Sequence, residues 1–358
     1  MLSLLWGSAP ASAQETHYFR IGAAATAGSF FEIGGVIASG ISKPADSPPC
    51  DQGGSCGVPG LVAVAQATRG SLDNLLMIAS DQIESGIAQS DVASWAYTGT
   101  GIFAGEAPLR KLRAIATLFP ERLHLVVRAE SPIQTLDDLK GRRISLGQTG
   151  SGTLVDARIV LAASGLAEKE LSPEYLRSGT AAANLSEGTL EGFFLIGGVP
   201  IPAIRALAGT TPIRLVPIAD EVLSKMRAKY GPYDRAAIPA GTYPGVGVAT
   251  QTVGFHALWV VSANASDDLI YAITRGCGTR PRSAFSMRMT RSGSRCGWRT
   301  RSTAFPYRSI REPNDTIARP GCPSRMTGSP CRPIDAGTSR KLRPFSGPSR
   351  SEQWMSLG

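Results

Sequence analysis

Short apolar runs alternate with longer stretches of helical periodicity over the first 275 residues of the chain. Runs rich in Val, Ile and Phe predict buried strands, and apolar positions three and four residues apart predict helices. The predicted strands are 17–22, 62–65, 83–93, 113–119, 124–128, 193–200, 213–218 and 252–261. The predicted helices are 30–41, 135–141 and 154–161, with others beginning at 69, 202 and 267. This alternation indicates an α/β fold with mostly parallel sheets, in which ligands bind beyond the carboxyl ends of the strands.

A glycine-rich turn, Gly147–Thr153, joins the apolar strand end Arg143–Leu146 to the helical pattern that begins at Leu154. The first backbone N–H groups of a helix have no partner within the helix, and the helix dipole is positive there. Strand, glycine turn and helix start therefore predict an anion site. A turn of the same plan, Ala23–Ser29, follows the first predicted strand. Glycine-rich turns in α/β folds are often only turns, so one turn alone leaves a purely structural role open.

Charge is distributed unevenly along the chain. The net charge of +9 arises in residues 276–358, which hold 15 Arg and 1 Lys against 4 acidic residues. The first 275 residues carry 21 basic and 24 acidic side chains, so they are mildly acidic. The overall basic charge therefore gives no support for nucleic-acid binding by this part of the chain.

The tail 276–358 is rich in Arg, Ser and Pro and contains no Val, so it cannot bury much of a core. One interpretation is a natural disordered arm that binds nucleic acid. We favour a frameshifted gene, in which case the tail would be disordered and the protein could be defective. If the plus-two reading frame from codon 276 soon meets a stop, or encodes nothing amphipathic, the frameshift interpretation is wrong.

Residues 1–14 resemble the end of a secretory signal peptide, because a short apolar run precedes the small-x-small pattern Ala11-Ser-Ala13. The positive segment that normally opens such a signal is missing, so either the true start lies upstream or export is weak. A flexible terminus with no signal role is the alternative. We predict a truncated signal and an exported, periplasmic protein. No later run approaches the roughly 18 apolar residues of a membrane span. In an exported protein, the spacing of Cys50 and Cys56 predicts a small disulfide, with zinc the weaker alternative.

Signatures of enzymes are largely missing from the sequence. The only histidines are His17, His124 and His256, and their spacing does not indicate a metal site. The Gly147–Thr153 turn lacks the Lys of a phosphate-binding loop. No GxSxG sequence lies between a predicted strand and a predicted helix, where a nucleophile elbow would place it. We therefore predict a protein without catalytic residues, metal or cofactor.

Several segments together resemble the solute-binding subunits of TRAP transporters, specifically the TAXI family, over about Tyr18–Arg275. Each segment is weak evidence by itself, and the combination is specific. The chain departs from the family pattern in two places: Ala23–Thr26 replaces a GTGS-like run, and Gly192 replaces an Asp. The matching segments are Gly22–Phe31, Thr68–Leu75, Gln89–Asp91, Leu118–Arg128, Leu136–Gly141, Ser145–Thr153, Gly192–Pro202, Ile238–Tyr243 and Asp268–Tyr271.

The resemblance implies a two-lobe fold of the type II periplasmic-binding-protein kind, with crossing strands and a ligand cleft between the lobes. Lobe 1 would comprise residues 15–121 and 240–275, and lobe 2 residues 122–239. The protein would capture a small organic acid or amino acid, glutamate-like or dicarboxylate, and deliver it to the membrane permease subunit of a TRAP transporter. An enzyme acting on a small carboxylate on the same scaffold is the alternative.

By position, the resemblance implies a ligand-binding set from both lobes. Helix N-termini and hydroxyls would hold a carboxylate, Asp91 would take an ammonium group, and Phe30 would pack on an apolar stem. The set is Ser29, Phe30, Ser71, Gln89 and Asp91 from lobe 1, and Thr149, Ser151, Gly152, Thr153 and Gly198 from lobe 2.

Overall fold

A computed structural model describes residues 16–231 and 233–278 of the chain. The predicted signal remnant, 1–14, and nearly all of the predicted tail, 276–358, lie outside this range. The strands are β1 (His17–Gly22), β2 (Ser42–Lys43), β3 (Val58–Pro59), β4 (Leu61–Gln66), β5 (Ser85–Gln89), β6 (Leu112–Arg128), β7 (Arg143–Ser145), β8 (Ser172–Glu174), β9 (Gly192–Gly197), β10 (Ile213–Leu215), β11 (Asp234–Ile238) and β12 (Thr250–Ser262). The α-helices are α1 (Ser29–Ile41), α2 (Ser71–Ala79), α3 (Ser90–Thr98), α4 (Gly152–Ser164), α5 (Ser178–Glu187), α6 (Pro202–Ala208), α7 (Asp220–Tyr230) and α8 (Asp267–Gly278).

One mixed sheet contains the twelve described strands, and the predicted α/β class is confirmed. The main path through the sheet is β3-β2-β4-β1-β5-β12-β6-β9-β7-β8, with β10 paired to β6 and β11 paired to β12. β1 pairs in parallel with β4 and β5, and β7 pairs in parallel with β8 and β9. The central strands β12 and β6 are antiparallel to their neighbours. The prediction of mostly parallel sheets was therefore wrong at the centre.

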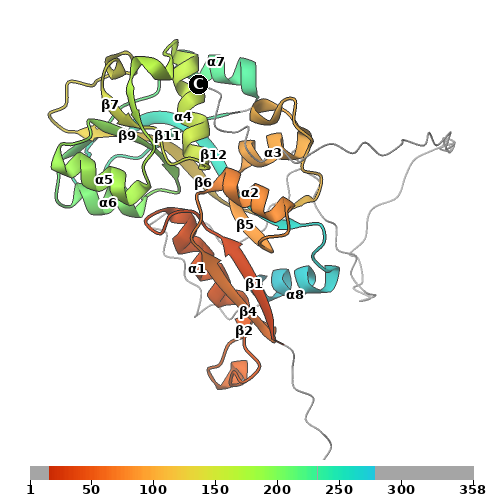
Figure 1. The fold of residues 1–358 in the computed structure, drawn as a ribbon. Coiled ribbons are helices and arrows are strands. Elements are labelled where there is room, and N and C mark those ends of the chain that lie inside the picture. The colour runs from red at the N-terminus through yellow and green to blue at the C-terminus, as the bar shows by residue number, and fades with distance from the viewer. Residues whose placement is uncertain (1–15, 232, 279–358) are drawn as a thin grey trace, which may run out of the picture. The chain divides into compact units, whose positions relative to one another are not determined.

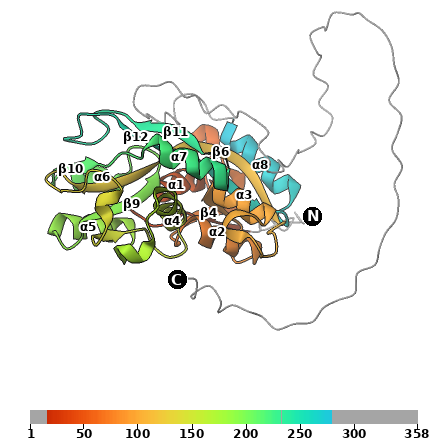
Figure 2. The same cartoon turned by 90° about the horizontal axis from the view of Figure 1, so that it is seen from above.

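The same strand order occurs twice, and it defines two lobes. In lobe 1, β1 lies between β4 and β5, and the late strand β12 inserts between β5 and β6. In lobe 2, β7 lies between β8 and β9, and the second half of β6, which crosses over from lobe 1, lies between β9 and β10. Each lobe thus contains one strand that arrives from the other lobe, which is the two-lobe type II architecture. The two groups of elements, joined through β6 and β12, can be followed in Figures 1 and 2.

The crossing strand β6 is longer and more continuous than the sequence pattern predicts. The segments 113–119 and 124–128 were expected as two strands with Pro120–Arg122 between them, but Leu112–Arg128 forms a single strand of 17 residues. Pro120 stands opposite His256 of β12, at a position where β6 has not yet begun to pair with β9, since that pairing starts at Arg122. Because β6 and β12 run unbroken through both lobes, the exact lobe boundaries stay a prediction.

Two other element predictions needed correction. The strand expected over 83–93 ends at Gln89, and Ser90 begins α3. The helix expected over 135–141 is only a 3-10 turn at Asp137–Leu139. Within the described residues, three further turns of this kind are present, at Cys50–Gln52, Gly101–Phe103 and Glu168–Glu170. The long return strand expected over 252–261 is present as β12.

Buried and exposed side chains alternate along β1, and the buried ones form part of the lobe 1 core. Phe19 and Ile21 are buried, whereas Tyr18 on the opposite face is 70% exposed. The buried pair packs with α1 and with Ile270 and Ile273 of α8. A second buried cluster lies under α5 and α6 of lobe 2, and a third lies between α3, α4 and α7.

The predicted bond between Cys50 and Cys56 is present in the structure, in the loop between β2 and β3. Within residues 16–231 and 233–278, no helix has both the length and the apolar character that crossing a bilayer requires.

Candidate functional site

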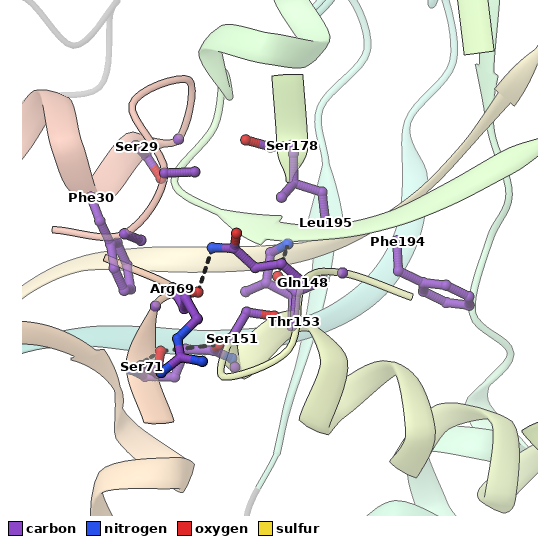
Figure 3. A pocket seen from close by; sticks show the side chains of 18 of the residues that line it. Ser29, Phe30, Arg69, Ser71, Gln148, Ser151, Thr153, Ser178, Phe194 and Leu195 are labelled. Carbon is purple, nitrogen blue, oxygen red and sulfur yellow. Dashed lines mark hydrogen bonds between the residues drawn. The ribbon is translucent and has the colours of Figure 1, made fainter. Parts of the chain in front are cut away.

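A cavity of about 60 Å³ lies between the two lobes, where strands of both lobes end and helices begin. Seven of the ten residues predicted to bind the ligand line it: Ser29, Phe30, Ser71, Gln89, Ser151, Gly152 and Thr153. The other lining residues are Ala24, Ala25, Gly28, Arg69, Gly70, Gly147, Gln148, Leu176, Ser178, Ala181, Phe194, Leu195 and Ile196. Figure 3 shows the labelled side chains of this group around the cavity.

The turn before α4 has the geometry that its glycines predict. Gly147 (φ 99°) and Gly150 (φ 86°) adopt left-handed conformations, which a side chain at these positions would disfavour. Ser151 is the N-cap of α4, and its hydroxyl accepts a hydrogen bond from the Leu154 N–H at 3.1 Å. Gly152 and Thr153, the first residues of α4, line the cavity together with this cap.

Four helices begin at residues that line the cavity: α1 at Ser29, α2 at Ser71, α4 at Gly152 and α5 at Ser178. Two belong to each lobe. The partial positive charge at each N-terminus favours an anion in the space between them. The arrangement can therefore hold a small carboxylate from both sides of the cleft.

Direct hydrogen bonds join the lobes around this cavity. The Gly198 N–H of lobe 2 donates to the Ser29 hydroxyl at 3.1 Å. The Gln148 side-chain amide donates to the Arg69 carbonyl at 2.6 Å, as Figure 3 shows. The Asp73 N–H donates to the Gly150 carbonyl at 3.1 Å. These bonds define a closed cleft.

Behind the cavity, Gln89 connects to a group of buried acids. Its side-chain amide donates to the Asp156 carboxylate at 2.7 Å, and Asp156 also accepts the Tyr233 hydroxyl at 3.3 Å. The Asp91 carboxyl lies against Asp156. Burial, and then the charge of Asp91, raise the pKa of Asp156 well above its ordinary value. Burial also raises the pKa of Asp91.

Three predicted ligand residues do not line the cavity. The oxygens of Asp91 are buried beside Asp156, and Asp91 is not among the residues that line the cavity. Thr149 is exposed on the turn. Gly198 is not a lining residue, but its N–H donates a hydrogen bond to the Ser29 hydroxyl, which does line the cavity.

Sequence reasoning missed three polar side chains that line the cavity, namely Arg69, Gln148 and Ser178. A serine just before a helical pattern is a recognisable start signal, and the run Ser178-Gly-Thr-Ala-Ala could have indicated the beginning of α5. Arg69 and Gln148 carry no comparable signal, because their place at the cavity depends on how the lobes meet.

Within the part of the chain that the structure describes, no group of three or more His, Cys, Asp or Glu side chains is arranged to hold a metal ion. His124, which is buried in β6, is bound on both ring nitrogens. One nitrogen lies 2.9 Å from the Arg122 carbonyl and the other 2.9 Å from the Tyr243 hydroxyl. It is therefore a structural residue of the crossing strand.

The fold and the cavity define a two-lobe α/β protein of type II topology with a closed interlobe cleft. The chain belongs to the NMT1-like family, which matches residues 21–277.

Solved structures with detectable likeness include the alkanesulfonate-binding protein SsuA from Xanthomonas axonopodis pv. citri bound to MOPS. It has 19% identity, covers 74% of each chain and has a TM-score of 0.41. An ancestral arginine-binding protein bound to arginine has 13% identity, covers 73% of this chain and 91% of its own, and has a TM-score of 0.42. The periplasmic aliphatic sulphonate binding protein SsuA from Escherichia coli has 14% identity, covers 73% of each chain and has a TM-score of 0.38.

Proposed function

We propose that this protein is an extracytoplasmic solute-binding protein that captures a small organic acid or amino acid in the interlobe cleft. The observation that carries the proposal is the convergence of four helix N-termini, two from each lobe, on one cavity. Closure over the ligand would signal the loaded state to a membrane partner, a hinge movement of a kind common in two-lobe binding proteins.

The finer assignment rests on the motifs in the sequence. Their resemblance to the TAXI family supports a periplasmic location and delivery to the permease subunit of a TRAP transporter. The glycine turn at Gly147–Thr153, which matches the family motif, lines the cavity and supports this assignment. Ala23–Thr26, the departure from the family pattern, lies in the loop between β1 and α1, and two of its alanines line the cavity. The ligand therefore need not be the one that the family usually binds.

A thermal-shift screen with small carboxylic acids and amino acids tests the proposal. A ligand that binds only the native state at about one hundred times its Kd stabilises the fold by ~2.7 kcal/mol, which corresponds to a rise in Tm of about 5–10 °C. We expect such a rise, without turnover, for at least one small acid. Chemical conversion of an acid, or no shift with any member of the screen, would contradict the proposal.

A further inference from the structure

One side chain at the cavity has an unused hydrogen-bonding group. Ser178, the first residue of α5, is only 8% exposed, and its hydroxyl has no hydrogen-bond partner among the residues that the structure describes. It lines the cavity and is labelled in Figure 3. A buried hydroxyl normally has a partner, so this one indicates a ligand atom within its reach.

Three other hydroxyls at the cavity are arranged as donors. The oxygens of Ser29, Ser151 and Thr153 each accept a backbone N–H, from Gly198, Leu154 and Ile196 respectively, at 3.1–3.2 Å. A hydroxyl has one hydrogen to donate, and accepting a bond leaves that hydrogen available. With Ser178 and the helix N-termini, the wall of the cavity is thus rich in donors.

Acceptors for a cation are scarce at the same wall. No carboxylate lines the cavity, and the amide oxygens available there are the neutral ones of Gln148 and of Gln89, whose Oε1 already lies 3.4 Å from the Ser71 hydroxyl. Arg69, the one charged side chain in the lining, is paired with Asp73 at 3.0 Å. An ammonium group that enters this cavity would lose its hydration and would find no carboxylate to pair with. Burying an unpaired charge in this way is strongly unfavourable.

We infer that the ligand is a carboxylate that carries no ammonium group, and that the Ser178 hydroxyl donates a hydrogen bond to its anionic head. The inference rests on the proposed function, because it concerns the same cavity, and it narrows the ligand class. The position of Asp91 agrees with it, since the acid predicted to hold an ammonium lies behind the cavity beside Asp156. The small volume, about 60 Å³, favours short acids.

Matched pairs of ligands test the ligand class. Isothermal titration calorimetry at pH 7.5 would compare propionate with alanine, succinate with aspartate, and glutarate with glutamate, since each pair differs by one α-ammonium group. We expect the acid without the amino group to bind at least ~10-fold tighter in the pair that binds best. An amino acid that binds as tightly as its partner, or tighter, overturns this inference and leaves the proposed function intact. If no acid of either class binds, the proposed function fails, and this inference fails with it.

Replacement of Ser178 tests the assignment of the donor. A hydrogen bond to a charged group is strong enough that Ser178→Ala should weaken binding of the best acid by about 10-fold or more. The Tm of the ligand-free protein should stay unchanged, because the hydroxyl has no partner within the described fold. Thr180→Ala is the matched control, since Thr180 is exposed on the same helix turn and should leave affinity unchanged. Wild-type affinity in Ser178→Ala would overturn the assignment, and the matched ligand pairs test the ligand class without any substitution.

Discussion

At the scale of single residues, the closed cleft depends on a contact that buries ionisable groups from both lobes. Gln89 and Asp91 belong to lobe 1, and Asp156 belongs to lobe 2. Gln89 donates to Asp156, and the Tyr233 hydroxyl donates to the same carboxylate. Glu121, whose pKa is also raised by burial and by the charge of Asp91, lies nearby. No cation is among the groups that set the pKa of Asp156.

This contact predicts that ligand affinity depends on pH. Because burial raises the pKa of Asp156 when the lobes meet, the closed form binds a proton that an open, solvated carboxylate would release. Closure, and therefore binding, should be favoured at low pH and should weaken as pH rises through the raised pKa. The slope can approach about tenfold per pH unit, the limit for one proton.

Calorimetric Kd values between pH 5.5 and 8.5, with a ligand that is ionised throughout, would measure this dependence. Asp156→Asn keeps the shape but removes the titration, so it should flatten the profile. Asp46→Asn, at an exposed loop position, should keep the wild-type slope. An unchanged slope in Asp156→Asn would exclude Asp156 as the titrating group.

At the scale of elements, the close approach of α4 to β5 depends on a residue without a side chain. A Cβ on Gly152, the first residue of α4, would overlap the Gln89 side-chain oxygen and crowd the Ser71 hydroxyl at 2.8 Å. Gln89 cannot move away freely, because it is bonded to the buried Asp156. The glycine therefore allows the helix N-terminus of lobe 2 to contact lobe 1.

Gly152→Ala should consequently weaken ligand binding by about tenfold or more. Displacing Gln89 leaves the buried carboxylate short of a donor, a loss of about 1–3 kcal/mol that falls on the closed form. Gly35→Ala in α1 is the matched control, since a Cβ there meets nothing within 4 Å. If both variants bind like the wild type, the lobe contact through Gly152 does not support closure.

The crossing strand β6 buries two ionisable side chains whose effects on stability have opposite signs. Burial raises the pKa of Glu121, so the stability that it contributes is present at low pH and is lost as pH rises through that raised value. Burial lowers the pKa of His124 from 6.5 to about 4, so stability is lost as pH falls through this window.

Glu121→Gln should therefore raise the free energy of unfolding at pH 8 by about 1–3 kcal/mol, because it removes an unpaired buried carboxylate. At pH 5 the effect should be smaller. Urea unfolding at both values would measure it, with Glu106→Gln, an exposed position, as the control. Equal effects of Glu121→Gln at both pH values would show that its ionisation does not limit stability.

Local patterns predict the elements and part of the site, and contacts between distant segments account for the rest. The extent of α1 and the glycine turn before α4 followed from periodicity and turn chemistry. The unbroken β6 did not, because Pro120 reads locally as an interruption while pairing with β12 and β9 carries the strand through. In the same way, Asp91 reads as a polar end of a strand, but α3 begins at Ser90 and carries the carboxyl inward to Asp156.

At the scale of the whole molecule, the two lobes repeat one strand order and exchange strands through β6 and β12. Each lobe contributes two helix N-termini to the cavity, so neither lobe alone provides the complete anion site. Binding should therefore require both lobes, and closure should order the turns that meet across the cleft.

Hydrogen–deuterium exchange with and without a stabilising acid tests this central claim most directly. The account predicts that the ligand slows exchange at the starts of α1, α2, α4 and α5 together, in both lobes. Protection confined to one lobe, or located away from these four helix starts with a ligand that raises Tm, would contradict it.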